Sequence, residues 1–289
     1  MMLNPKFIDE GAAMKQTHNQ QPALRNPAKD RMRAGDVALG ITVRITRSPD
    51  IARIARETGH DFIYIDAQHS IFNLETIAAM ALEALACDVA PIVRVRGVDD
   101  PDVSLLLDNG VTGIVFPNVA TAEQARRAVS AAKFPPVGQR TVTGTYAHFG
   151  YRSVPLTAAV PMFNDATLVV VMIESPEGLA NVEEIAAVDG VDVVLIGTND
   201  MLFAMGKPGQ FDDEEIVAAI DRTIAAADAN GKFSGCGGNR NVEGQLAVIR
   251  KGVRFMTTQT DVGFMFSGAT AWTTGLRTGF ENGGTSAGS

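Results

Sequence analysis

The sequence predicts a single (β/α)8 barrel, the TIM-barrel fold of the α/β class. Eight short apolar runs rich in β-branched residues alternate along the chain with longer stretches of helix-forming residues. Strict alternation of this kind implies a parallel sheet, and eight units in about 250 residues are typical of a closed barrel. The chain has 289 residues, of which 46% are hydrophobic, so it can bury a core of that size.

The eight apolar runs are expected to be strands buried on both faces. Several are apolar without interruption, which is typical of parallel strands covered by helices on one side and a filled interior on the other. The runs are Val37–Val43, Phe62–Asp66, Pro91–Val95, Gly113–Phe116, Leu168–Ile173, Val191–Ile196, Phe233–Gly235 and Phe255–Thr258.

The segments between these runs have the amphipathic pattern of helices, and a glycine suited to a left-handed C-terminal cap follows several of them. They are Ile51–Thr58, Leu74–Ala86, Val103–Asn109, Ala122–Ala132, Pro176–Val188, Asp213–Ala229 and Val242–Lys251. A doubly wound open sheet is the alternative fold. It usually carries a G-x-G-x-x-G turn after its first strand, which this sequence lacks.

The barrel is expected to occupy residues 34–280, between an N-terminal arm (1–33) and a disordered, Gly/Ser-rich tail (281–289). Residues 264–280 are apolar for a chain end, which indicates either an interface helix or a helix packed on its own barrel. The connection 134–161 is long and carries Arg140, Tyr146, His148, Tyr151 and Arg152. Long loops at a barrel mouth are often functional, so these residues are candidates for shaping a substrate pocket.

Composition excludes several classes of protein. A net charge of −8 argues against a nucleic-acid partner. No apolar run reaches the roughly 18 residues of a membrane span, and residues 1–33 lack the pattern of a signal peptide, so we expect a cytoplasmic protein. Cys87 and Cys236 form no CxxC pair, which indicates neither a zinc site nor a disulfide framework.

Five ionisable residues stand at the C-terminal ends of the predicted strands, where barrel enzymes place their chemistry. They are Asp66, His69, Arg94, Glu174 and Asp200. Buried unpaired charge is costly, so such groups need partners or a metal.

Each of these residues has more than one interpretation. The carboxylates Glu174 and Asp200 suit Mg²⁺ or Mn²⁺, although Glu174 could instead pair with Arg94 or cap the next helix. His69 is either a general base oriented by Asp66 or a structural histidine at the rim. Arg94 is either a structural ion-pair partner or a cation that stabilises an enolate.

The ordered set of motifs resembles the HpcH/HpaI aldolase family of metal-dependent pyruvate aldolases, over residues 35–270. The resemblance rests on Phe62–His69, Pro91–Arg94, Leu107–Gly110, Gly113–Pro117, Phe134–Gly138 with Arg140, Met172–Glu174, and Gly190–Gly197 leading to Asp200.

The resemblance implies a role for each matching residue. Glu174 and Asp200 would bind the divalent metal (Mg²⁺, Mn²⁺ or Co²⁺), and the backbone at Asn199 and Asp200 would hold the pyruvate carboxylate. His69 would act as the base, assisted by Asp66, while Arg94 steadies the enolate. Asp108 would reach a histidine of a neighbouring subunit, which implies a homo-oligomer built from dimers, up to a hexamer.

Five positions depart from the family pattern. Met172 replaces a glutamine expected to bind near the substrate, and a thioether cannot replace its hydrogen bonds. Gln68 replaces a glutamate, Thr198 and Asn199 replace Pro-Ala, and Asn118 replaces a small aliphatic residue or methionine. The metal site is retained and the pocket is altered, with Met172 and Asn199 expected to contact the substrate.

The expected function is that of an aldolase (a lyase) that cleaves or forms 4-hydroxy-2-oxo acids from a small 2-oxo acid and an aldehyde through a pyruvate-type enolate. Oxaloacetate decarboxylation and condensation with a second keto acid, as in citrate synthesis, are alternatives on the same scaffold. A CoA-ester lyase is less favoured, because no basic patch suits the CoA phosphates. A barrel that binds a small acid without turnover is the non-enzymatic alternative.

Overall fold

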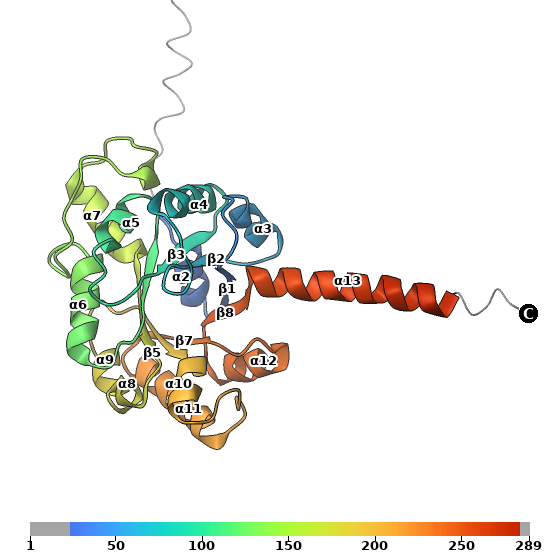
Figure 1. Ribbon diagram of the computed structural model, residues 1–289. Helices are drawn as coiled ribbons and strands as arrows, with labels where there is room; N and C mark the ends of the chain where they lie inside the picture. The colour runs from blue at the N-terminus through green and yellow to red at the C-terminus, as the bar shows by residue number, and fades with distance from the viewer. Residues whose placement is uncertain (1–23, 284–289) are drawn as a thin grey trace, which may run out of the picture.

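The computed structural model describes residues 24–283, and its centre is a closed barrel of eight parallel strands in sequence order (Figure 1). Every predicted run forms a strand, with ends within two residues of those expected, so the predicted fold class is confirmed. The strands are β1 (Ala38–Val43), β2 (Phe62–Asp66), β3 (Ala90–Arg94), β4 (Gly113–Phe116), β5 (Leu168–Ile173), β6 (Val193–Gly197), β7 (Phe233–Gly237) and β8 (Phe255–Thr260).

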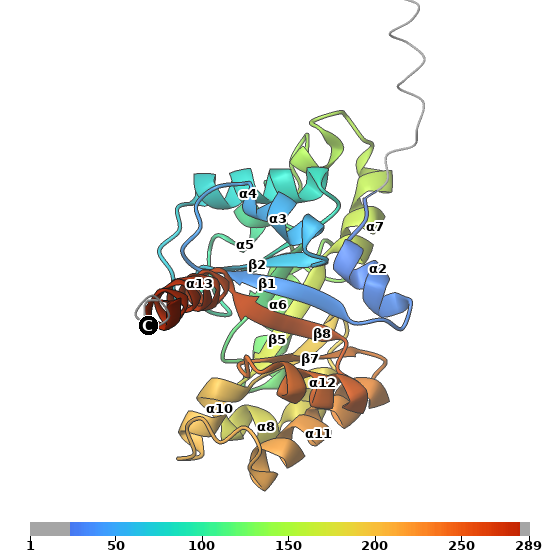
Figure 2. The same cartoon turned by 90° about the vertical axis from the view of Figure 1, so that its right-hand side faces the viewer.

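A ring of helices covers the outside of the barrel (Figures 1 and 2). The helix predicted over 176–188 is divided at Asn181, whose side-chain amide donates to the carbonyl of Ala120 at 2.8 Å. The outer helices are α3 (Ile51–Glu57), α4 (Leu74–Ala86), α5 (Val103–Asp108), α6 (Ala122–Ala132), α8 (Pro176–Ala180), α9 (Val182–Ala186), α10 (Thr198–Ala204), α11 (Glu214–Ala229) and α12 (Val242–Lys251).

The strands are buried on both sides, as their unbroken apolar runs predict. One set of strand side chains packs beneath the helices, and the other fills the barrel interior, where the rings of Phe62 and Phe255 stack with centroids 4.4 Å apart. Gly40 of β1 lies beside this pair, and a Cβ there would stand 1.9 Å from the Phe62 ring. A glycine is therefore needed at this position, because any side chain would displace the stacked rings inside the barrel.

Residues placed in the N-terminal arm by sequence analysis form part of the barrel floor. Helix α2 (Pro27–Arg33) buries Ala28 and Met32 against the interior residues at the N-terminal end of the strands (Figure 2). The buried ammonium groups of Lys29 and Lys133 both contact the carboxylate of Asp192, at 2.6 and 3.1 Å. Residues 1–23 of the expected arm and 284–289 of the expected tail lie outside the described residues.

No residue of the connection 134–161 lines the cavity of its own chain at the C-terminal end of the barrel. This connection leads into α7 (Leu156–Ala166), and Phe134, Tyr146 and Phe149 are buried around Phe163, whereas Tyr151 is exposed. His148 contacts the carbonyl of Val111, just before β4 begins, through Nε2 at 3.2 Å. The segment therefore packs beside the N-terminal end of β4, because its aromatic side chains gain more from burial there than from exposure at the mouth.

The last helix, α13 (Asp261–Gly283), projects away from the barrel (Figures 1 and 2). Every side chain from Phe264 to Glu281 is exposed, so the alternative that this segment packs on its own barrel is wrong, and its role as an interface helix stays a prediction. Within residues 24–283, no helix is both long enough and apolar enough to cross a membrane.

Candidate active site at the barrel mouth

A cavity of about 240 Å³ opens at the C-terminal end of the barrel. Most of the residues selected from the strand ends line it, namely Asp66, His69, Arg94, Met172, Asn199 and Asp200. Glu174 lies just behind the cavity wall, because a Cβ on Gly197 would stand 2.9 Å from its Oε2. These residues lie together at the mouth of the barrel, as the position of catalytic residues at strand ends in such barrels predicts.

Arg94 and Asp66 form a two-pronged ion pair across β2 and β3. The Arg94 Nε donates to Oδ1 of Asp66 at 3.0 Å, and Nη2 donates to Oδ2 at 2.8 Å. Burial alone would raise the pKa of Asp66, but the hydrogen bonds and charge of Arg94 outweigh it and lower this pKa. Asp66 is thus a fixed anion that holds the guanidinium of Arg94 in one orientation.

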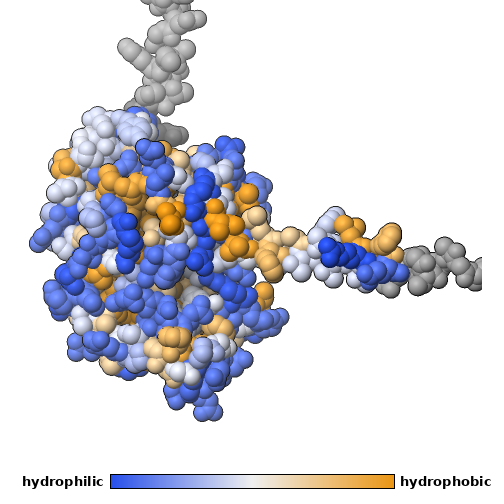
Figure 3. Space-filling model, viewed as in Figure 1, coloured by the Kyte–Doolittle hydropathy of each residue, from blue (hydrophilic) through white to orange (hydrophobic). Residues whose placement is uncertain are grey.

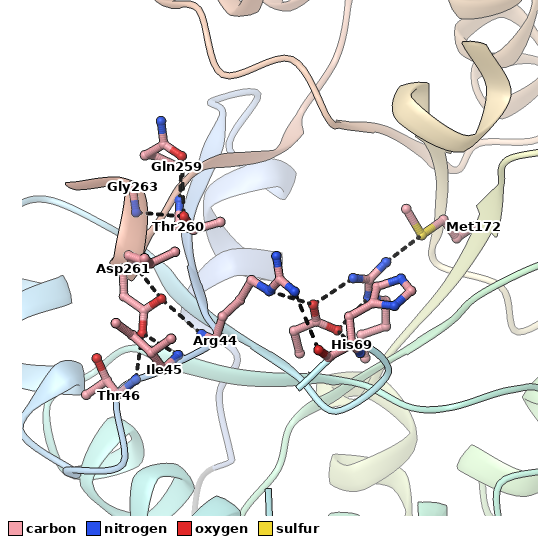
Figure 4. A network of polar contacts seen from close by, with 12 residues as sticks. Arg44, Ile45, Thr46, His69, Met172, Gln259, Thr260, Asp261 and Gly263 are labelled. Carbon is pink, nitrogen blue, oxygen red and sulfur yellow. Dashed lines mark hydrogen bonds and ion pairs between the residues drawn. The ribbon is translucent and has the colours of Figure 1, made fainter. Parts of the chain in front are cut away.

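His69 lies at the edge of the cavity, beside Arg44 (Figure 4). Its backbone N–H donates to Oδ1 of Asp66 at 3.2 Å, whereas no hydrogen bond joins its ring to Asp66 in the described part of the chain. Sequence analysis expected Asp66 to orient the imidazole. In the structure, Asp66 instead positions the loop that carries His69.

Glu174 follows β5, and its two oxygens have different surroundings. Oε1 accepts a hydrogen bond of 2.8 Å from the backbone N–H of Asn118. Oε2 is buried and has no hydrogen-bond partner within residues 24–283. Asn118 has a φ of +54°, a left-handed conformation that asparagine tolerates better than the aliphatic residues usual at this position.

The surroundings of Glu174 fit a divalent cation. A buried carboxylate oxygen without a donor is costly, and Asp200, in the first turn of α10, supplies a second carboxylate next to it. Within residues 24–283, no group of three or more His, Cys, Asp or Glu side chains could hold a metal. Two carboxylates are nevertheless sufficient for Mg²⁺, which keeps several waters and binds through one or two protein carboxylates.

The alternative interpretations of Glu174 are wrong. Ser175 caps α8, because its Oγ accepts from the N–H of Gly178 at 3.1 Å. No ion pair joins Glu174 to Arg94 in the described chain, since Arg94 is engaged by Asp66. Glu174 therefore remains available as a ligand.

The pH dependence of stability should reveal this carboxylate. Burial, together with the negative charge of Asp200, raises the pKa of Glu174 to about 7, whereas its usual value is 4.5. Between these two pH values the folded chain holds a proton that the unfolded chain has released. The free energy of unfolding therefore falls as the pH rises from about 4.5 to about 7, and it stays low above that range.

With a chelator present, we expect the free energy of unfolding of the unsubstituted protein to fall by about 2 to 3 kcal/mol between about pH 5 and pH 8, relative to that of the Glu174→Gln variant. Glutamine keeps the shape of the side chain and removes its charge. Urea unfolding of both proteins at both pH values measures the difference. Parallel pH profiles for the two proteins would mean that Glu174 ionises normally.

The departures from the family pattern alter the wall opposite Asp66. The Sδ of Met172 lies 4.0 Å from Nη1 of Arg94, a weak contact through the one prong that Asp66 leaves free. Thr198 donates through its Oγ1 to the carbonyl of Gly237 at 2.9 Å, which joins the ends of β6 and β7. Asn199, next to it, is exposed to the cavity.

Sequence analysis missed two cavity arginines, Arg44 after β1 and Arg240 after β7. The backbone around Arg44 is held by Asp261, the first residue of α13, whose carboxylate accepts from the N–H groups of Arg44, Ile45 and Thr46 (Figure 4). Both arginines follow the end of a strand, so the rule that selected the other residues could have found them.

Asp108 does not reach the cavity of its own chain. It lies at the end of α5, where its Oδ1 accepts from Nη2 of the buried Arg140 at 2.6 Å. Its role toward a neighbouring subunit stays a prediction.

The chain is similar to known proteins over most of its length. Residues 45–264 match the family model described as HpcH/HpaI aldolase/citrate lyase. A 4-hydroxy-4-methyl-2-oxoglutarate aldolase of Chaetomium globosum is 37% identical over 235 residues, which cover 79% of this chain and 86% of the relative. A hydroxypyruvate/pyruvate aldolase of Delftia acidovorans is 34% identical over 256 residues, with coverages of 87% and 92%.

Solved structures share the whole barrel. An HpcH/HpaI aldolase from Desulfitobacterium hafniense superposes with a TM-score of 0.83 at 27% identity, covering 88% of this chain and 97% of that one. A citrate synthase superposes with a TM-score of 0.77 at 29% identity, covering 88% and 98%. The likeness therefore spans both aldolases and a condensing enzyme.

Proposed function

Because the chain belongs to the HpcH/HpaI aldolase/citrate lyase family and is a lyase, we propose that it is a divalent-metal-dependent aldolase acting on 4-hydroxy-2-oxo acids through a pyruvate-type enolate. One observation carries the metal dependence. The Oε2 of Glu174 is buried without a hydrogen-bond donor and lies next to Asp200 at the wall of a cavity that Arg94 also lines.

In this proposal Glu174 and Asp200 hold the cation. When bound, the cation would supply a Lewis acid that stabilises negative charge on the 2-oxo oxygen. Arg94 adds a second positive charge at that oxygen through the prong that Asp66 leaves free. The backbone N–H groups at Asn199 and Asp200, in the first turn of α10, bind the carboxylate of the oxo acid.

His69 moves the proton of the 4-hydroxyl group. In the cleavage direction its ring, directly or through a water, accepts this proton while the C3–C4 bond breaks. C4 becomes the carbonyl carbon of the released fragment, and the electron pair of the broken bond passes to the enolate. Protonation at C3 then gives pyruvate.

The second candidate is condensation of the enolate with another keto acid. Two observations favour keeping it, namely the similarity to a citrate synthase and the replacement of the expected glutamine by Met172. The same residues would form the enolate, so the two candidates differ only in the carbonyl compound it attacks.

Pyruvate release from a panel of 4-hydroxy-2-oxo acids and from oxaloacetate tests the proposal. The assay is run with a chelator and then with Mg²⁺, Mn²⁺ or Co²⁺ restored. Release that needs metal supports the aldolase. Release from oxaloacetate alone would indicate decarboxylation of that keto acid. Consumption of two keto acids without pyruvate release would favour the second candidate, and binding of metal and keto acid without any turnover would overturn both in favour of a binding protein.

We also propose that the chain works as a homo-oligomer in which Asp108 acts across an interface. Exposed apolar side chains on α13 support this, and Figure 3 shows hydrophobic residues at the base of that helix and on the adjacent barrel face. Isolated exposed helices with Phe266, Trp272 and Phe280 on their surface are costly unless covered. Light scattering should give a mass of at least two chains, and a single-chain mass would remove the basis for the Asp108 role.

A further inference from the structure

The proposed cleavage includes a proton transfer to which no residue has yet been assigned. C3 of the enolate must gain a proton before pyruvate can form. His69 serves the 4-hydroxyl group, and an arginine such as Arg94 does not lose its proton in proteins. Glu174 and Asp200 are needed as anions to hold the cation. A different side chain on the enolate side of the cavity must therefore supply the proton.

Tyr64 lies at the base of the cavity, beneath the ion pair between Asp66 and Arg94. It precedes Asp66 by two residues on β2, and both side chains line the cavity. Two residues along a strand span about 6.5 Å, so the tyrosine begins one layer deeper in the barrel than the ion pair. The guanidinium carbon of Arg94 lies 5.7 Å from the centre of the Tyr64 ring. The phenol is therefore next to the group proposed to stabilise the enolate oxygen.

The hydroxyl group of Tyr64 has no hydrogen-bond partner in the part of the chain that the structure describes. A buried tyrosine usually finds such a partner, as Tyr146 does by accepting from the N–H of Thr143 at 3.1 Å. A ring without a hydroxyl would fill the barrel equally well, since Phe62 and Phe255 do so in the same interior cluster. The hydroxyl is therefore free to act on a molecule bound in the cavity.

The charges around Tyr64 suit an acid that is stored protonated and can lose its proton briefly. Burial raises the pKa of Tyr64 well above its usual value, so the phenol keeps its proton at neutral pH. Arg94 and Arg240 act in the opposite direction, because their positive charges stabilise a phenolate. Arg240 is held in place by hydrogen bonds from its Nη1 to the carbonyls of Thr257 and Thr258, at 3.1 and 3.0 Å.

The groups proposed to hold the substrate define where C3 lies. The oxygen on C2 lies between the cation, at the ends of β5 and β6, and Arg94, at the end of β3. The 4-hydroxyl group faces His69, in the loop that follows β2. C3 joins C2 to C4, so it lies over the paired strands β2 and β3, where Tyr64 forms the base of the cavity.

We propose that Tyr64 is a catalytic residue whose hydroxyl group protonates C3 of the enolate. The O–H bond of the phenol breaks, and its electron pair stays on the phenolate oxygen. The proton is taken up by the C2–C3 electron pair of the enolate, which forms the new C3–H bond and restores the 2-oxo group. Water in the open cavity then returns a proton to the phenolate. This inference rests on the proposed aldolase function and adds the acid that completes it.

Tyr64→Phe tests the proposal, because it keeps the ring and removes only the hydroxyl group. In the reverse direction the phenolate removes a proton from the methyl group of pyruvate. We therefore expect metal-dependent exchange of these hydrogens for deuterium to slow at least about 100-fold. Cleavage of the C3–C4 bond comes before the protonation. Release of the carbonyl product in a single turnover should therefore slow less than about fivefold.

Tyr146→Phe is the matched control. It removes the hydroxyl group of a second buried tyrosine, which lies in the connection 134–161 and outside the cavity. Deuterium exchange and single-turnover cleavage should both keep their unsubstituted rates in this variant. The metal affinity from calorimetric titration should be the same in both variants and in the unsubstituted protein, which shows that the active site is folded.

Two results would overturn the inference. Deuterium exchange at the unsubstituted rate in Tyr64→Phe would mean that water or another group protonates C3. Equal losses of exchange, cleavage and metal affinity would mean that the hydroxyl group only maintains the shape of the site. Failure of the proposed function gives a different result, because the unsubstituted protein would then neither cleave 4-hydroxy-2-oxo acids nor exchange the hydrogens of pyruvate.

Discussion

Replacing Glu174 with alanine is expected to lower metal-dependent kcat/KM at least about a thousandfold. The substitution removes one of two carboxylates available to the cation, together with the oxygen that is buried without a donor. Asp200 alone, exposed at the start of α10, would bind a divalent ion only weakly. The steady-state rate of pyruvate release and the metal affinity from calorimetric titration, measured on the same preparation, should both fall.

Glu177→Ala is the control for this experiment. Glu177 is an exposed carboxylate in the first turn of α8, three residues further along the chain. Its substitution should leave both the rate of pyruvate release and the metal affinity unchanged. Removing a buried negative charge should leave the metal-free Glu174→Ala protein no less stable at about pH 8. A variant that is less stable than the unsubstituted protein at this pH would therefore reveal misfolding as the cause of lost activity. Full metal-dependent activity in Glu174→Ala would show that the cation is held elsewhere.

The fold was predictable from the sequence because the signal for a parallel barrel is local and repeated. A run such as Leu168–Ile173 is apolar at every position, which is typical of a strand covered on both faces. The segments around the barrel were harder to predict. Helix α2 has seven residues and no long amphipathic pattern, so its burial at the barrel floor depends on contacts with Asp192 and other distant residues.

The sequence was sufficient to predict those residues of the candidate site that lie at the ends of strands. The positions of Asp66, Arg94 and Glu174 after apolar runs were enough to place them at one mouth. Their partners were not, since Asp66 could have oriented the His69 ring and instead holds Arg94. The importance of Asn118 also depends on a backbone conformation and a contact with β5, neither of which is visible in the sequence.

Arg94→Lys should lower kcat by about 100- to 1,000-fold, with a smaller change in KM. Lysine keeps the charge, but it cannot place two donors on Asp66 and a third toward the substrate oxygen at once. Because the negative charge on that oxygen grows as the C–C bond breaks, loss of an aligned donor should appear mainly in kcat. Single-turnover measurement of bond cleavage tests this without interference from product release.

Arg96→Lys is the matched control, two residues along the chain and outside the cavity. Arg96 also makes paired contacts with a carboxylate, since its Nε and Nη2 donate to Asp100 at 3.0 and 3.2 Å, but its side chain is exposed. If both lysine variants keep their rate, a positive charge near the oxo group is sufficient, and the two-pronged pair with Asp66 has only a structural role. If only Arg94→Lys loses rate, Asp66 is a positioning residue that acts through Arg94, and the buried ion pair is part of the catalytic geometry.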